Sequence, residues 1–156
     1  MNCFIGIDPG KTGGVAVISE DGKVMVSIEM PVTSTKEINS AYLYALFTSI
    51  KEETFCVIEK SQSMPKQGVK STFSYGVGYG EVRAVLKASL TPFQEVAPAT
   101  WKKEFNLIKK AKMDSCDTAQ KLFPSESFLT ERGRMMDGKA EALLLAEYAR
   151  RLSCRK

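Results

Sequence analysis

Four carboxylates, Asp8, Glu59, Asp137 and Glu141, stand where a strand or a helix would hold each of them rigidly. Asp8 closes an apolar segment that starts at residue 3, and Glu59 closes a second one that starts at residue 54. Asp137 and Glu141 are four residues apart at the start of an apolar helical pattern, so both point from one helix face. Acids gathered at low dielectric repel one another, and divalent cations remove that cost. The pattern therefore predicts metal-dependent phosphodiester chemistry.

The chain has no histidine, which narrows the chemistry further. Without imidazole, a Ser-His-Asp or Cys-His site is excluded and zinc lacks its usual nitrogen ligand, so carboxylates and lysines remain. Carboxylate oxygens suit hard cations such as Mg²⁺. The cysteines are scattered without C-x-x-C spacing, which predicts reduced, structural thiols at Cys3, Cys56, Cys116 and Cys154.

Length and composition indicate one domain over residues 1–156. Apolar residues make up 44% of the chain and charged residues 26%, the balance of a globular protein. No apolar run approaches the ~20 residues that span a bilayer, and no secretory signal opens the chain, so we expect no membrane role and a cytoplasmic protein. The net charge of +4 is a mild basic excess that favours a polyanionic partner.

Apolar patterns predict the elements that must hold the acids. Strands are expected at 2–8, 13–19 and 23–29, with a hairpin turn at Asp21-Gly22. A capping-box pattern at 34–37 followed by apolar residues at helical spacing predicts a helix over 35–52. The strand that ends at Glu59 follows it.

The second half alternates helices with one more strand. A helix is expected over about 72–90, although the glycines near its start favour a proper beginning only at Glu81. We expect a strand at 93–97, a short helix at 98–105, a helix capped by Asp114 and Asp117 that ends before Pro124, and a last helix over 136–152. The basic stretch 102–112 is expected to be a mobile loop. These elements predict an α/β fold with a mixed sheet covered by helices.

Three segments together resemble a known family. Residues 4–10 (FIGIDPG), Ile58-Glu59 and residues 137–146 (DGKAEALLLA) match, in order and spacing, the RuvC-type Holliday-junction resolvases of the ribonuclease H-like superfamily. The blocks at 64–68, 73–80 and 98–102 also resemble the phage and plastid branch of that family. The resemblance extends over nearly the whole chain and implies a ribonuclease H-like fold, with a five-stranded mixed sheet and helices on both faces.

The resemblance implies a homodimeric endonuclease that makes paired, symmetric nicks in a four-way DNA junction, in a bacterial or phage-infected cell. It implies Mg²⁺ or Mn²⁺ held by the four acids, and no nucleotide cofactor. Two divalent ions about 4 Å apart activate a water on one side of phosphorus and stabilise the leaving oxygen on the other. Asp8 would bridge both ions, Glu59 would hold one, and Asp137 and Glu141 would complete the ligands.

Two positions depart from patterns within the family, and a third, Lys112, resembles one of them. Gly138 occupies a position where the plastid-type pattern has histidine, and other branches have aspartate where this chain has Glu141. Lys112 resembles a lysine that lies near the scissile phosphate in the family, where its charge would offset the charge that develops during attack. A solvated loop lysine is the alternative for Lys112.

Aromatic and basic side chains mixed with glycines are suited to stacking bases beside phosphates. The residues expected to contact DNA are Lys66, Gln67, Lys70, Phe73, Tyr75, Tyr79, Lys102, Lys103, Lys109 and Lys110. The alternatives are aromatics packed into the core and a solvated run of lysines. An apolar stripe on the 72–90 helix fits either a dimer interface or the core; it comprises Val82, Val85, Leu86 and Leu90.

Other functions stay open. A nuclease of the same fold could act on flaps or RNA-DNA hybrids, and a non-catalytic protein could bind junctions without cutting them. Residues 6–10 also resemble the phosphate loop of actin-like ATPases, although the chain is too short for two lobes. Residues 6–12 miss the P-loop pattern because only three residues separate Gly6 from Gly10.

Overall fold

Three antiparallel strands open the chain: β1 (Asn2–Asp8), β2 (Gly14–Ser19) and β3 (Val24–Glu29). The computed structural model describes residues 2–155. Strands β4 (Glu53–Glu59) and β5 (Phe93–Val96) extend the sheet in parallel on the other side of β1, so the order is β3-β2-β1-β4-β5. The predicted five-stranded mixed sheet is confirmed. The hairpin between β2 and β3 turns at Gly22, where a φ of +83° suits glycine.

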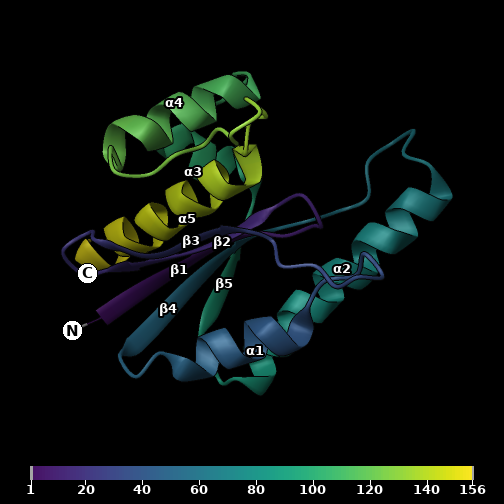
Figure 1. The fold of residues 1–156 in the computed structure, drawn as a ribbon, viewed down its shortest axis with the longest axis horizontal. Coiled ribbons are helices and arrows are strands. Elements are labelled where there is room, and N and C mark those ends of the chain that lie inside the picture. Colours follow the sequence, from purple (N-terminus) through teal and green to yellow (C-terminus); the bar gives the residue numbers. More distant parts are fainter. Residues whose placement is uncertain (1, 156) are drawn as a thin grey trace.

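Helices cover both faces of the sheet (Figure 1). Helices α1 (Ser40–Ser49) and α2 (Val69–Ala88) lie on one face. Helices α3 (Pro98–Glu104), α4 (Lys112–Leu122) and α5 (Asp137–Cys154) lie on the other. Because both faces are covered, β1 and β2 are apolar and buried along almost their whole length. Two separate apolar clusters result, one on each side of the sheet.

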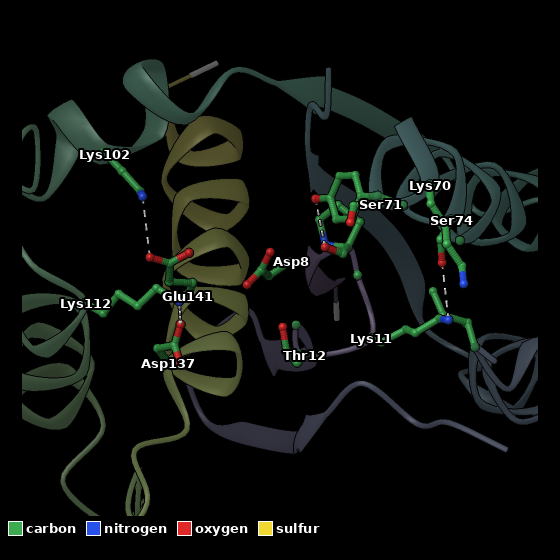
Figure 2. A pocket seen from close by; sticks show the side chains of 16 residues that line it. Asp8, Lys11, Thr12, Lys70, Ser71, Ser74, Lys102, Lys112, Asp137 and Glu141 are labelled. Atoms are coloured by element: carbon green, nitrogen blue, oxygen red, sulfur yellow. Dashed lines mark hydrogen bonds and ion pairs between the residues drawn. The ribbon is translucent and has the colours of Figure 1, made fainter. Parts of the chain in front are cut away.

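Helix α5 approaches the centre of the sheet closely because β1 carries Gly6 there. A Cβ atom at Gly6 would come within 3 Å of backbone atoms of Ala142, Leu145 and Ala146. Glycine at this position therefore lets α5 pack backbone to backbone on β1. The packing aligns the first turns of α5 with the end of β1, where Asp8 lies (Figure 2).

The predicted start of the first helix is wrong. Helix α1 begins at Ser40 rather than residue 35, because Asn39 caps it by accepting a hydrogen bond from the Tyr42 N–H at 3.0 Å. The supposed capping box lies in a turn closed by a bridge between Val32 and Ile38.

Helix α2 begins at Val69, close to the predicted start at about residue 72, and the later start at Glu81 that its glycines favoured is wrong. Gly78 contacts Ile38, and this packing helps to offset the low helix propensity of glycine.

The basic stretch 102–112 is not one loop. Lys102 and Lys103 belong to α3, and Lys112 begins α4. Phe105 and Leu107, which lie between those helices, are buried in the apolar cluster under α5. The segment between α3 and α4 is therefore anchored by its own apolar side chains, contrary to the mobile loop that was expected.

The apolar stripe on α2 faces the core. Val82, Val85 and Leu86 are buried against the sheet, whereas Leu90 is 88% exposed beyond the helix end. The prediction that the stripe faces the core is therefore correct for Val82, Val85 and Leu86.

All four cysteines are free thiols, and burial raises the pKa of Cys116 to about 11.

No helix in residues 2–155 is both long enough and apolar enough to cross a membrane.

Candidate active site

A cleft of about 820 Å³ opens where β1 ends and α5 begins. Asp8, Asp137 and Glu141 line it, and Figure 2 shows Asp8 between the two α5 acids and the opposite wall. Glu59 lines an adjoining hollow of about 290 Å³ that shares Tyr75 with the cleft. The structure thus brings three predicted acids into one cleft and places the fourth beside it.

The sheet register brings Asp8 and Glu59 to the same edge. Ile7 pairs with Ile58 across the parallel strands β1 and β4, so the acid that follows each residue stands at the carboxyl end of its strand. Asp137 is the first residue of α5 and Glu141 lies one turn later. The expected strand-end and helix-face positions of these acids are as observed.

Two glycines allow α5 to begin beside the loop that follows β1. A Cβ atom at Gly138 would come within 3 Å of backbone atoms of Thr12 and Gly13, and one at Gly14 would collide with the backbone of Gly138 and Lys139. The backbone of residues 12–14 therefore lies directly against the backbone at the start of α5, with no side chain between them. Close backbone packing explains why a residue without a side chain stands at position 138.

Burial and the negative charges of neighbouring acids raise the pKa of Asp8 and of Glu59. Burial raises the pKa of Asp8 well above its usual range, and the charges of Glu141, Glu59 and Asp137 raise it further. Burial also raises the pKa of Glu59, with a smaller contribution from Glu141. A carboxylate that is destabilised by three neighbouring acids is a group that a bound cation would stabilise.

Three of the four acids form ion pairs or hydrogen bonds with other side chains of the protein. Lys112 Nζ lies 3.0 Å from Asp137 Oδ2, and Lys102 Nζ lies 3.5 Å from Glu141 Oε1, as Figure 2 shows. The pairing with Asp137 raises the pKa of Lys112. Glu141 Oε1 also accepts a hydrogen bond from the buried Ser115 hydroxyl at 3.2 Å.

Glu59 has a different partner. Its Oε2 accepts a hydrogen bond of 2.7 Å from the indole nitrogen of Trp101, a fully buried side chain on α3. Sequence reasoning assigned no role to Trp101 or Ser115, because nothing local in the chain shows that they reach acids on other elements.

The donor chemistry fits a hard divalent cation, since four carboxylates supply only oxygen. In residues 2–155 no three Asp, Glu, Cys or His side chains are gathered closely enough to hold a metal ion together. The ammonium groups of Lys102 and Lys112 instead lie against Glu141 and Asp137. A ready-formed four-acid ligand set, as the sequence led us to expect, is therefore not what the structure contains.

The wall of the cleft opposite α5 contains Lys70 and Tyr75, which were predicted, and several polar residues that were not. Lys11 and Thr12 come from the loop after β1, and Ser71 and Ser74 come from α2 beside Lys70. Lys11 Nζ donates a hydrogen bond to Ser74 Oγ at 3.4 Å. The signal was present in Lys11-Thr12, which follows Asp8 closely, and in the helical spacing of Lys70 and Ser74.

Tyr75 holds loops together beside the acids. Its hydroxyl donates to the Pro9 carbonyl at 3.1 Å and shares a hydrogen bond with Ser61 at 3.0 Å. Its ring lies against Gly10, where a Cβ atom would come within 2.9 Å of it. Tyr75 therefore connects α2 with the segments that follow Asp8 and Glu59.

The other predicted DNA contacts are spread over several surfaces. Lys70 and Lys102 line the cleft, and Gln67 and Tyr79 line a smaller hollow of about 210 Å³ with Tyr75. Tyr79 packs against the core, with the Arg83 guanidinium 5.6 Å from its ring centre. Phe73 is 76% exposed. The remaining predicted contacts are exposed and do not line the cleft: Lys66, Lys103, Lys109 and Lys110.

Comparison with solved structures identifies the fold. The chain is similar to the RuvC structure of Thermus thermophilus, with a TM-score of 0.64, 21% identity and 96% of each chain covered. It is equally similar to T. thermophilus RuvC in complex with a Holliday junction substrate, with a TM-score of 0.64, 19% identity, and coverage of 97% of this chain and 96% of that one. No protein-family model and no curated protein matches the chain. The RuvC resemblance expected from the motifs is confirmed at the level of the fold, which is ribonuclease H-like.

Proposed function

We propose that this chain is a divalent-metal-dependent endonuclease that resolves four-way DNA junctions. The observation that carries the proposal is the set of four interacting acids at the ends of β1, β4 and the start of α5, on the fold of RuvC. One of the two similar structures is a complex with a Holliday junction substrate, which supports a junction as the DNA form.

Asp8, Glu59, Asp137 and Glu141 would hold Mg²⁺ or Mn²⁺, and we propose two ions per site. Ions bound there would supply an activated water and would stabilise the oxygen that leaves phosphorus. The raised pKa of Asp8 supports this assignment, because a cation relieves the repulsion that raises it. Lys102 and Lys112 would be free to contact phosphate once cations neutralise Glu141 and Asp137.

The two walls of the cleft would have different tasks. Asp137 and Glu141 lie on the α5 side with Lys102 and Lys112, whereas Lys11, Lys70 and Ser74 lie on the other (Figure 2). We propose that this second wall binds backbone phosphates of the strand being cut, since ammonium and hydroxyl groups are usual phosphate contacts.

Paired nicks require two sites related by symmetry, so the proposal includes a homodimer. Helix α2 presents a face of apolar and small residues to solvent. Val69, Phe73 and Val77 are exposed on it, and Cβ atoms added at Gly76 and Gly80 would meet nothing within 4 Å. Such a face allows a second helix to approach closely. We propose that residues 1–156 form one nuclease domain that acts in the cytoplasm.

The test uses an immobile four-way junction incubated with the wild type, Asp8→Asn and Glu59→Gln, in Mg²⁺ or in EDTA. Symmetric nicks on a denaturing gel that disappear in EDTA and in both variants support the proposal. A parallel panel of flap, RNA-DNA hybrid and duplex substrates assigns the substrate. Preference for a flap or hybrid would replace the resolvase function, and tight junction binding without cutting would replace catalysis by binding alone.

A further inference from the structure

The only tryptophan of the chain donates its indole hydrogen bond to a candidate metal ligand. Trp101 Nε1 lies 2.7 Å from Glu59 Oε2, and the Trp101 side chain has no exposed surface. From this contact we infer that Trp101 is a positioning residue that orients Glu59 for cation binding. The inference rests on the proposed function, because it takes Glu59 to be a ligand.

Strand β5 and the start of α3 together place Trp101 beside Glu59. Strand β5 pairs in parallel with β4, and Glu59 lies opposite Val96. The chain then enters α3 at Pro98, so the first turn of this helix stands beside the end of β4. Pro98 at the first helical position favours a helix start at this place, because its backbone angle is already set. Residue 101 therefore faces the acid although 42 positions separate it from Glu59.

Packing makes the indole a fixed donor. Its ring lies in the apolar cluster beneath α5 and meets Phe105 edge to face, with ring centres 6.4 Å apart. A ring held in this way cannot turn its N–H elsewhere without opening the core. Among residues 2–155 no hydrogen bond reaches the other oxygen, Oε1, of Glu59. The bond thus immobilises one oxygen of the carboxylate and leaves the second available to a cation.

The next residue on α3 reaches a different acid. Lys102 Nζ lies 3.5 Å from Glu141 Oε1 and 5.3 Å from the centre of the Trp101 ring. Adjacent residues of one helix therefore hold Glu59 on β4 and Glu141 on α5. The lysine can leave when a cation binds, whereas the indole is neutral and can remain. This difference is why we assign the positioning role to Trp101.

The first experiment is spectroscopic and needs no DNA. Trp101 is the sole source of tryptophan emission, so a cation bound at Glu59 should change that emission. The wild type and Glu59→Gln are titrated with Mg²⁺ and with Mn²⁺ alone. We expect a saturable change in the wild type that Glu59→Gln weakens or removes. No change in the wild type, or an equal change in both proteins, would overturn the inference.

The second experiment separates positioning from packing. Trp101→Phe keeps an aromatic ring but lacks the N–H, whereas Phe105→Leu disturbs the same cluster and keeps the bond. For Trp101→Phe we expect the Mg²⁺ concentration at half-maximal cleavage to rise about 10–100-fold, with junction affinity in EDTA unchanged. Phe105→Leu should lower the melting temperature without this change. Equal Mg²⁺ dependence in Trp101→Phe and the wild type, or equal increases in both variants, would show that Trp101 only packs.

These experiments also distinguish a failure of the positioning role of Trp101 from a failure of the proposed resolvase function. A wild type that responds to Mg²⁺ through Trp101 but cuts no junction supports the positioning role and contradicts the resolvase function. If the wild type cuts junctions and Trp101→Phe keeps the same Mg²⁺ dependence, the resolvase function is supported and the positioning role is contradicted. If Trp101→Phe fails to fold, the fluorescence comparison with Glu59→Gln decides the inference.

Discussion

Lys112 and Asp137 begin two different helices, and their side chains meet with Nζ 3.0 Å from Oδ2. An ammonium group at a helix N-terminus opposes the helix dipole, whereas a carboxylate there is favourable. Asp137 therefore compensates the charge of Lys112 as well as standing in the cleft. Because 73% of the Lys112 side chain is exposed, the pair is open to competition from a cation in solution.

Replacing Lys112 should separate metal binding from catalysis. In Lys112→Gln no ammonium competes for Asp137, so we expect half-maximal cleavage at an equal or lower Mg²⁺ concentration. The rate at saturating Mg²⁺ should fall by about 10²-fold, because a charge near the reacting phosphate is lost. Single-turnover cleavage measured over a Mg²⁺ series tests both effects. Lys121→Gln removes an exposed lysine of the same helix outside the cleft and serves as the control. An unchanged maximal rate in Lys112→Gln would contradict the role of Lys112.

Asp8 should destabilise the metal-free protein at neutral pH. Its pKa is raised by folding, so its contribution to stability is complete below the unfolded value and is lost as pH rises through the folded value. In EDTA, Asp8→Asn should therefore melt at a higher temperature than the wild type at pH 7, by roughly 2–4 °C for each kcal/mol recovered. The difference should vanish below pH of about 4, where the wild-type acid is protonated in both states.

Asp21→Asn is the control for these melting-temperature measurements. The Ser19 hydroxyl bonds to Asp21 and lowers the pKa of that exposed acid, so its contribution is present above the unfolded value and lost as pH falls. Asp21→Asn should accordingly change stability at pH 7 in the opposite direction to Asp8→Asn. Mg²⁺ should raise the melting temperature of the wild type and have less effect on Asp8→Asn. A lower melting temperature for Asp8→Asn in EDTA at pH 7 would show that the acids do not repel in this way.

A side chain at position 138 should be costly. A Cβ atom there would come within 3 Å of backbone atoms of Thr12 and Gly13, so Gly138→Ala must push α5 away from the loop after β1. We expect a loss of about 1–3 kcal/mol in the free energy of unfolding, with Gly138→His more damaging still. Urea denaturation measures the loss. Gly68→Ala is the matched control, since its nearest atom would be Ser71 Oγ at 3.9 Å; similar losses in both would contradict close packing at 138.

A charge on the outer face of α2 should prevent the proposed dimer. Ala84 is exposed on this helix, on the side away from the buried Val82 and Val85. Ala84→Glu would place two like charges close together across a two-fold axis, which is unfavourable where water is excluded. Light scattering should give a dimer for the wild type and a monomer for the variant, and paired nicks should become rare. Lys87→Gln, a change on the same helix that adds no negative charge, should remain dimeric; a wild-type monomer would contradict the interface.

The chain's local patterns predicted the elements and most of the acids' positions. Strand ends placed Asp8 and Glu59, and the four-residue spacing placed Asp137 and Glu141, because apolar periodicity and chain direction are encoded within a few residues. Local signals failed at helix starts. The turn closed by Val32 and Ile38 displaced the start of α1, and α2 is helical from Val69 onward although its glycines have low helix propensity.

Only the tertiary structure decided what surrounds those acids. Trp101 reaches Glu59, Lys112 reaches Asp137, and Gly138 lies against Thr12, although each pair is far apart in the sequence. These contacts depend on strand register and on how closely α5 packs over Gly6. Tyr75 is a further example. Its residue type suggested base stacking, whereas in the structure its hydroxyl donates a hydrogen bond to the Pro9 carbonyl and connects α2 with the loop after β1. Residue type and spacing are local properties, whereas partnership between side chains is a property of the packed fold.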